Sequence, residues 1–264
     1  MDINEAPSRV YVGADVGASH TKVAILDGRG ALIGHGVRKS GTNFTATADA
    51  CLAIALKSAH RTPDQIAHCV STGYGRKNVS YAKATRTEIG CHARGCYYFF
   101  PQAMSIIDIG GQDNKIIKLD AGGRRTSFKM NRKCAAGTGA FLEEMALRLD
   151  IPLTSMDRLA RQAQSMVKLG SYCTVFSATE VLEHIRSGKK VADIIKGLYF
   201  SVIRRVLEMD VLTDAVVMTG GVVAHNPFLV QMAETEIGQS VQVPEFPQFT
   251  GAIGAALYAM EDAI

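Results

Sequence analysis

The chain has 264 residues, of which 47% are hydrophobic and 20% charged, as in a globular protein of one large domain or two small lobes. The formal net charge of +4 is too small to indicate a nucleic-acid partner, and no run of Lys and Arg is interleaved with aromatic residues. No apolar stretch reaches the roughly 18 residues that span a bilayer, and residues 1–9 do not resemble a signal peptide. We therefore expect a cytoplasmic protein without nucleic-acid or membrane partners, whose six cysteines are reduced thiols.

Apolar runs and turn residues predict the elements in chain order. The first half is expected to contain strands at 10–16, 21–26 and 31–37, a helix at 45–60 and a strand at 66–71. The second half is expected to contain strands at 105–109 and 115–119, helices at 135–149, 177–186 and 192–209, a strand at 215–218 and a helix at 251–260.

The most informative feature is an internal repeat. Residues 15–22, Asp-Val-Gly-Ala-Ser-His-Thr-Lys, match residues 108–115, Asp-Ile-Gly-Gly-Gln-Asp-Asn-Lys. Each copy continues through apolar residues to a second aspartate, Asp27 or Asp120, at the same spacing. Two strand–turn–strand units with the same turn chemistry indicate duplicated lobes, at 1–103 and 104–264. The final helix, at about 251–264, is a candidate to pack back on the first lobe.

The two turns have the composition of phosphate-binding loops. Small residues between strands let several backbone N–H groups point into one concavity, which suits phosphate oxygens. Asp15 and Asp108, each at a strand end, are suited to hold Mg²⁺ directly or through water. Gln112 and Asp113 are placed to orient or deprotonate an attacking water. The residues expected to hold phosphate are Gly17, Ala18, Ser19, His20, Thr21, Lys22, Gly110 and Gly111.

A third glycine-rich strand exit, at residues 216–226, has the form of an adenosine-binding segment. Gly220, Gly221 and Gln248 are expected to line the nucleoside side. An ordinary hairpin turn with a capping aspartate would explain one turn alone, but not the repeat. A Rossmann domain is disfavoured, because no G-x-G-x-x-G follows the first strand and the aspartate-led turns precede strands. The sequence therefore predicts an ATP-hydrolysing α/β protein of the actin/hexokinase-like (ribonuclease H-like) fold, with two lobes around a nucleotide cleft.

Four of the six cysteines, Cys51, Cys69, Cys91 and Cys96, are typical of small buried hydrophobes. Cys91, His92 and Cys96 could in principle bind a metal, but no second pair at metal-site spacing lies nearby. The roles of Cys91 and Cys96 stay open.

Cys134 and Cys173 differ from the other cysteines. Cys134 is expected at the start of the 135–149 helix, where the helix N-terminus with Arg132 and Lys133 would favour a thiolate. Cys173 follows thirty-nine residues later, before another helix. Two thiolates cannot complete a cubane iron–sulfur cluster, which takes four, whereas two from each of two subunits can. The residues alone leave this possibility open.

With these motifs the chain resembles the ATPase components that activate 2-hydroxyacyl-CoA dehydratases and the ATPase subunits of benzoyl-CoA reductase. The match covers nearly the whole chain. The C-A-A-G-T-G and C-T-V-F pieces are the specific ones, since sugar kinases of this fold have no reason to carry them. The matching segments are residues 13–17 with Lys22, 72–76, 91–93, 108–113, 133–139, 173–176, 218–222 and 251–258.

The resemblance implies that Cys134 and Cys173 of each subunit ligate one [4Fe–4S] cluster across a dimer interface. It also implies that ATP hydrolysis drives a helix rearrangement at the cluster, and that an electron from a ferredoxin or flavodoxin then reaches a partner reductase or dehydratase at very low potential. The second ATPase subunit can be identical or a paralogue. One departure is Ala18-Ser19, where the family commonly has Ser-Thr, so one hydroxyl contact to phosphate is lost.

Two alternatives remain at this point. One is a small-molecule kinase of the same fold, without a cluster. The other is a nucleotide-dependent sensor whose cysteines are structural.

Overall fold

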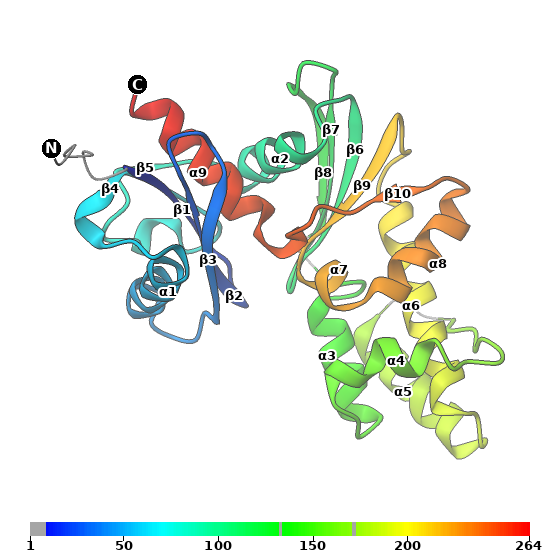
Figure 1. Ribbon diagram of the computed structural model, residues 1–264. Helices are drawn as coiled ribbons and strands as arrows, with labels where there is room; N and C mark the ends of the chain where they lie inside the picture. Colours follow the sequence, from blue (N-terminus) through cyan, green and yellow to red (C-terminus); the bar gives the residue numbers. More distant parts are fainter. Residues whose placement is uncertain (1–8, 132–133, 171–172) are drawn as a thin grey trace, which may run out of the picture. The chain divides into compact units, whose positions relative to one another are not determined.

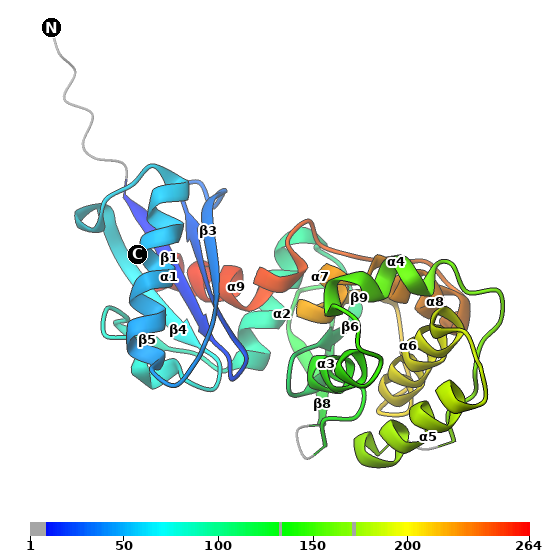
Figure 2. The same cartoon turned by 90° about the horizontal axis from the view of Figure 1, so that it is seen from below.

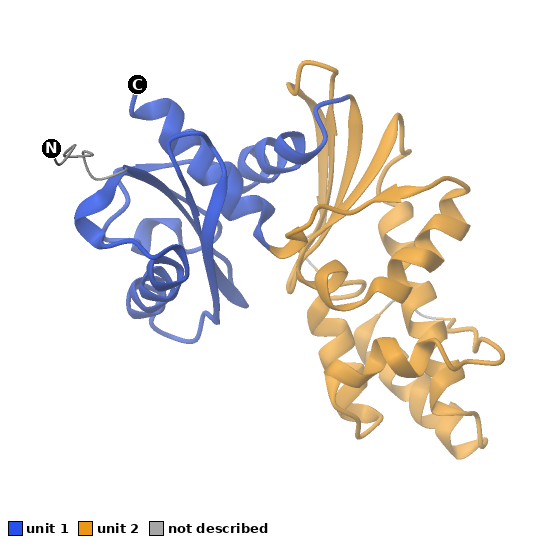
Figure 3. Cartoon of the chain, in the orientation of Figure 1, with its two compact units in different colours: residues 1–102, 249–264 blue, residues 103–248 orange. Residues whose placement is uncertain are grey.

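The computed structural model describes residues 9–131, 134–170 and 173–264. The chain forms two compact units, one of Met1–Gln102 with Phe249–Ile264 and the other of Ala103–Gln248 (Figure 3). Each unit contains a five-stranded mixed sheet with helices packed on it (Figure 1). No helix in the described parts of the chain is long and apolar enough to cross a membrane.

The sheet of the first unit has the strand order β3-β2-β1-β4-β5. β1, β2 and β3 are antiparallel neighbours, whereas β4 runs parallel to β1 and β5 parallel to β4. The elements of this unit are β1 (Val10–Val16), β2 (His20–Leu26), β3 (Leu32–Lys39), α1 (Phe44–Ala59), β4 (Ile66–Thr72), β5 (Ala84–Thr85), α2 (Glu88–Phe99) and α9 (Thr250–Asp262), with short 3-10 helices at Pro63–Gln65 and Arg76–Asn78.

Helices cover both faces of this sheet (Figure 2). Because side chains alternate along a strand, Val12 and Ala14 of β1 pack in one core with Ala48 and Ala55 of α1. The intervening Gly13 faces α9 instead. β1 is thus buried on both sides, in agreement with its continuous apolar run.

The sheet of the second unit has the order β10-β9-β6-β7-β8. Its strand directions repeat those of the first sheet, with β6, β7 and β8 antiparallel and β9 parallel to both β6 and β10. The elements are β6 (Met104–Ile109), β7 (Asn114–Leu119), β8 (Arg125–Asn131), α3 (Gly139–Arg148), α4 (Met156–Ala160), α5 (Thr174–Arg186), α6 (Val191–Leu207), β9 (Ala215–Thr219), α7 (Gly221–His225), α8 (Pro227–Ile237) and β10 (Val241–Gln242), with 3-10 helices at Leu153–Ser155 and Pro247–Phe249.

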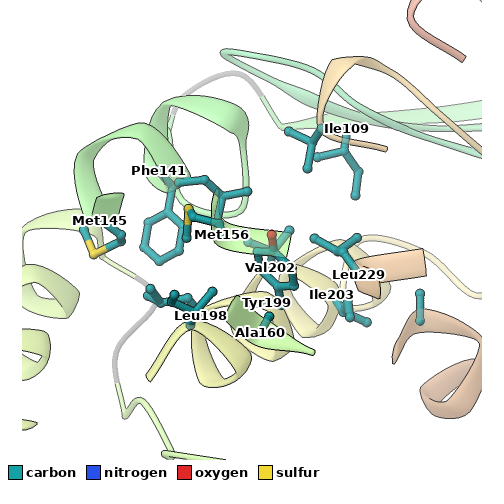
Figure 4. Close-up of a cluster of buried hydrophobic side chains, with 14 of the residues drawn as sticks. Ile109, Phe141, Met145, Met156, Ala160, Leu198, Tyr199, Val202, Ile203 and Leu229 are labelled. Carbon is teal, nitrogen blue, oxygen red and sulfur yellow. The ribbon is translucent and has the colours of Figure 1, made fainter. Parts of the chain in front are cut away.

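The core of the second unit lies between its sheet and its helices. Figure 4 shows Phe141 and Met145 of α3 packed toward Leu198 and Tyr199 of α6, with Ile109 of β6 nearby. These side chains are at most 1% exposed. α3 is therefore held on one side by apolar packing against α6.

Every helix and strand predicted from the sequence is present, most with ends shifted by one to three residues. The helix predicted at 135–149 is the largest exception, since α3 begins only at Gly139. Gly137 has a φ of +81°, which breaks the helix before that point. The pattern did not reveal α2, β8 or α8; β8 is exposed from Arg125 to Lys129, so it lacks the apolar alternation that marks a half-buried strand.

α2 and α9 approach each other closely through glycines. A Cβ atom on Gly254 of α9 would lie 1.8 Å from the carbonyl oxygen of Cys91, and one on Gly95 of α2 would lie 2.0 Å from that of Thr250. Neither backbone oxygen can move aside as a flexible side chain could. This contact is therefore possible only without side chains at these positions.

Substitution Gly254→Ala should lower the free energy of unfolding by about 1–3 kcal/mol, because the added methyl group forces α2 and α9 apart. Chemical denaturation followed by circular dichroism measures this change. Gly28→Ala is the matched control, since a Cβ there has no atom within 4 Å, and its effect should stay within about 0.5 kcal/mol. Equal effects of the two substitutions would contradict the close-approach argument.

Candidate functional site

A lysine–aspartate pair recurs at the same place in both sheets. Asp15 of β1 lies directly opposite Lys22 of β2, and Asp108 of β6 lies opposite Lys115 of β7. In each pair the lysine Nζ is 3.0 Å from the aspartate Oδ2. Both aspartates are 2% exposed, so each buried carboxylate has a charged partner. The sequence repeat is thus also a repeat in three dimensions.

The second carboxylate oxygen of Asp15 is buried and has no hydrogen-bond partner among the described residues. The space beside it is kept open by Gly73, whose φ is +87° and whose Cβ, if present, would lie 2.6 Å from this Oδ1. A buried carboxylate oxygen without a hydrogen-bond partner is unfavourable unless a cation or a water molecule binds it. Oxygen ligands of this kind suit Mg²⁺, so Asp15 fits a role in holding that ion.

Gly220 repeats the role of Gly73 in the second unit. It follows β9 as Gly73 follows β4, its φ is +102°, and a Cβ there would lie 2.7 Å from Asp108 Oδ1. No function of Gly73 was expected from the sequence. The signal that could have found it is the repeated Thr-Gly at the end of each of these strands, Thr72-Gly73 and Thr219-Gly220.

The first turn, between β1 and β2, is closed by the backbone. The Gly17 amide donates to the carbonyl of His20 at 3.1 Å, and the Ser40 amide donates to the carbonyl of Ser19 at 3.0 Å. Ala18 is exposed at the tip of the turn. The outer face of this short turn therefore consists of backbone and small side chains, as a phosphate-binding nest requires.

Thr21 lies elsewhere than expected. Its side chain is fully buried, and its hydroxyl is 2.9 Å from the Ser40 hydroxyl, which in turn donates to the Gly17 carbonyl at 2.6 Å. Thr21 therefore supports the turn from within the unit and does not line its outer face. The reason is register: Thr21 pairs with Val16, whose side chain belongs to the core under α1.

The second turn, between β6 and β7, has the same closure and one extra ion pair. The Gly110 amide donates to the Asp113 carbonyl at 2.9 Å. Lys115 Nζ lies 2.6 Å from Asp113 Oδ1 in addition to its contact with Asp108. Gln112 is exposed. Of the two residues expected to act on water, Asp113 is thus held by a buried lysine, whereas Gln112 faces outward.

Gly220, Gly221 and Gln248 come together, although Gln248 is far along the chain. The Gly220 amide donates to the Pro247 carbonyl at 3.0 Å, and a Cβ on Gly221 would lie 3.5 Å from Gln248 Nε2. Gly220 also lies next to Asp108 Oδ1. The second unit therefore gathers the expected nucleoside residues at the strand end that carries the second phosphate turn.

The cysteines fall into two groups by burial. Cys51, Cys69, Cys91 and Cys96 are buried, Cys134 is half-buried and Cys173 is exposed. Burial raises the pKa of the Cys51, Cys69 and Cys91 thiols to about 12. Such thiols are poor metal ligands and poor nucleophiles. Access to the thiol therefore sets Cys134 and Cys173 apart.

Cys134 is not at a helix start, so the expected effect of the helix N-terminus on its thiol is wrong. It lies five residues before α3, and its Sγ accepts the Ala136 amide at 3.4 Å. The first α3 amides, of Gly139 and Ala140, donate to the carbonyls of Gly110 and Gly111 at 2.9 and 2.8 Å. Both amides are therefore hydrogen-bonded to the second turn. The neighbours Arg132 and Lys133 lie outside the described residues.

Cys173 does occupy a helix start, as the N-cap residue of α5, and its carbonyl accepts the Ser177 amide at 2.8 Å. α3 and α5 are neighbours, and their facing sides line a cavity of about 440 Å³. Val175 and Phe176, next to Cys173, are 71% and 64% exposed.

Cys134 and Cys173 are accessible thiols, the ligand type that iron–sulfur clusters take. One chain supplies only half of the four thiolates that such a cluster takes. Within the described residues no three His, Cys, Asp or Glu side chains gather as a metal site.

Comparison with known proteins shows similarity along nearly the whole chain. An activator of lactoyl-CoA dehydratase from Anaerotignum propionicum is 42% identical over 255 residues, 96% of this chain and 98% of the relative. A 2-hydroxyisocaproyl-CoA dehydratase activator from Clostridioides difficile is 39% identical, over 96% of this chain and 95% of the relative. A subunit of the benzoyl-CoA reductase from Thauera aromatica is 30% identical, over 77% of this chain and 74% of the relative.

Solved structures show the same fold. Component A of the (R)-2-hydroxyglutaryl-CoA dehydratase from Acidaminococcus fermentans has a TM-score of 0.92 and 35% identity, covering 97% of this chain and 99% of that chain. A ROK family glucokinase from Streptomyces griseus, at 12% identity, has a TM-score of 0.58 and covers 96% of this chain and 99% of that chain. The predicted actin/hexokinase-like α/β fold is thereby confirmed.

The family resemblance inferred from the motifs is also confirmed. The family described as BadF/BadG/BcrA/BcrD ATPase matches residues 12–259. Both aspartate-led turns and both accessible cysteines lie within this range. The chain belongs to the BadF/BadG/BcrA/BcrD ATPase family.

Proposed function

We propose that this protein hydrolyses ATP to drive a low-potential electron into a partner acyl-CoA enzyme. The observation that carries the proposal is the pairing of two features in the second unit. The phosphate turn at Gly110–Asp113 accepts the first amides of α3, and the segment that carries Cys134 leads directly into this helix. A nucleotide-binding turn and a thiol are therefore linked by hydrogen bonds within one compact unit.

In this proposal each turn residue has a defined task. Asp15 and Asp108 hold Mg²⁺ or its water, a role that the unpartnered Asp15 Oδ1 supports. Gly17–Lys22 and Gly110–Gly111 hold phosphate, with Thr21 acting through Ser40. Gln112 and Asp113 position the attacking water; because Lys115 holds Asp113, the exposed Gln112 is better placed to contact it.

Cys134 and Cys173 of two subunits hold one [4Fe–4S] cluster, which supplies one electron at low potential. The Ala136 amide donates to Cys134 Sγ, and Cys173 is the N-cap residue of α5. The four buried cysteines take no part. A second subunit, identical or paralogous, and a ferredoxin or flavodoxin as electron donor complete the system.

A 2-hydroxyacyl-CoA dehydratase is the favoured partner enzyme. The two dehydratase activators described above are 39% and 42% identical to this chain over 96% of it, whereas the benzoyl-CoA reductase subunit is 30% identical over 77%. Co-purification of the native complex without oxygen identifies the partner. Recovery of a benzoyl-CoA reductase component would instead assign the chain to ring reduction.

Substitution Asp108→Asn should reduce the rate of ATP hydrolysis by about 100-fold or more, because it removes the negative charge at the cation site and opposite the buried Lys115. Steady-state phosphate release at saturating Mg²⁺ measures the rate. Asp120→Asn is the control, since Asp120 lies at the far end of the same hairpin, where it accepts the Gly122 and Arg124 amides. Unchanged hydrolysis by Asp108→Asn would contradict the assigned role.

Protein purified without oxygen should be brown and contain about two iron atoms per chain, half of a four-iron cluster. Cys134→Ala or Cys173→Ala should abolish the iron and its absorbance, while Cys51→Ala and Cys69→Ala should retain both. Iron analysis and visible spectroscopy are the measurements. Iron that survives the loss of Cys134 would show the ligand assignment to be wrong.

The alternative function, a small-molecule kinase of the same fold, rests on the fold likeness to the glucokinase. It requires an acceptor-activating carboxylate and no iron. A colourless protein that transfers phosphate from ATP to a metabolite would favour it over the electron-transfer function.

A further inference from the structure

Among the described residues, three hydrogen bonds join the second turn and its exit to residues 137–140, which follow Cys134 in the chain. Two of them join backbone groups alone. The third uses a side chain, that of Asn114, the first residue of β7. The bonds are Gly139 N to Gly110 O at 2.9 Å, Ala140 N to Gly111 O at 2.8 Å, and Asn114 Nδ2 to Gly137 O at 2.9 Å.

The Asn114 side chain is an internal part of the contact between the turn and Gly137. It is fully buried, and it reaches Gly137, whose positive φ of +81° turns the chain just before α3. A Cβ on Gly137 would lie 3.2 Å from Asn114 Nδ2, so glycine allows the close approach. The Asn114 side chain therefore links the residue that follows the turn at Gly110–Asp113 directly to Gly137.

Asn114 also pairs with a residue that precedes Cys134 in the sequence. It is the direct cross-strand partner of Asn131, the last residue of β8. Asn114 Oδ1 and Asn131 Nδ2 are both buried, and neither has a hydrogen-bond partner among the described residues. One is an acceptor and the other a donor, and directly opposed side chains of a strand pair are within reach of each other.

The two residues next to Asn114 lie on either side of Cys134 in the sequence. Asn131 lies three residues before Cys134 and Gly137 three residues after it. A buried acceptor and a buried donor that are both unsatisfied favour a second arrangement in which they pair. The Asn114 carboxamide is thus placed to hold the Cys134 segment at one end or at both ends, according to the position of the phosphate turn.

We propose that Asn114 is a positioning residue that transmits the state of the second phosphate turn to Cys134. With one arrangement of the turn it holds Gly137 alone, and with the other it also accepts a hydrogen bond from Asn131. The inference rests on the proposed function, since it takes the turn at Gly110–Asp113 to bind nucleotide phosphate and Cys134 to be a cluster ligand. It adds the residue through which the two sites communicate.

The test uses the full chain without iron, under anaerobic conditions, and measures the rate at which iodoacetamide alkylates Cys134, by peptide mass spectrometry. In the wild-type protein this rate should differ about fivefold or more between Mg-ADP and a non-hydrolysable ATP analogue. Asn114→Ala and Asn114→Asp should bring the ratio close to one while ATP hydrolysis continues. The aspartate keeps the shape and the acceptor but lacks the donor to Gly137.

Ser105→Ala is the matched control. Ser105 lies in β6 of the same sheet, at the end away from the phosphate turn, and its buried hydroxyl donates to the Thr213 carbonyl at 2.7 Å. Its loss should lower the melting temperature, as the loss of Asn114 does, yet leave the nucleotide dependence of Cys134 alkylation intact. The control thereby distinguishes a general loss of protein stability from a loss of coupling between the phosphate turn and Cys134.

Three results would overturn the inference. One is a nucleotide-dependent ratio that persists in Asn114→Ala. Another is a wild-type rate that does not respond to nucleotide, which would refute the communication and leave the ATPase and iron assignments to their own tests. The last is a parallel loss of ATP hydrolysis in both Asn114 variants, which would show that Asn114 only shapes the nucleotide site.

Discussion

Both halves of the protein depend on a lysine–aspartate pair with a buried aspartate, which joins the first two antiparallel strands of each sheet. A lysine that is 1% exposed, as Lys115 is, is stable only with a charged partner, so the pair fixes which residue of β7 lies opposite Asp108. A slip of one residue would turn the lysine to the other face of the sheet and leave the carboxylate alone. The register in turn sets the length of the turn between the strands. The phosphate turns are consequently short because the ion pairs fix where their strands end.

The two copies share this lysine–aspartate pair but differ in the groups that contact the turn. In the first unit the turn is supported by side chains, through Thr21 and Ser40. In the second unit the supports are different: Lys115 holds a second carboxylate, and the carbonyls of Gly110 and Gly111 accept the first amides of α3. The second turn is therefore bonded to the helix that follows the Cys134 segment along the chain. The duplicated fold is therefore asymmetric at its two turns.

The first backbone amides of α3 could stabilise a negative charge or donate hydrogen bonds within the protein. A free helix N-terminus would stabilise a negative cluster, but α3 uses its first two amides to bind the phosphate turn. These two hydrogen bonds join the start of the helix to the turn. At α5 the N-terminal end remains with Cys173, which is the N-cap residue. One helix is thus hydrogen-bonded to the turn at Gly110–Asp113 and the other begins at Cys173, and the two are packed side by side in the same unit.

The sequence by itself determined most of the strands, the duplicated turns and the family, because apolar periodicity and the spacing from aspartate to lysine are local and repeat in register. It also separated Cys134 and Cys173 from the other cysteines by their motifs. It did not reveal Gly73, since the proximity of this glycine to Asp15 arises only when β4 lies beside β1. It misplaced the start of α3 and the contact of Thr21, because the first depends on carbonyls from another hairpin and the second on strand register. The tertiary structure alone decided these points, since hydrogen bonds between segments distant in the sequence leave no periodicity in it.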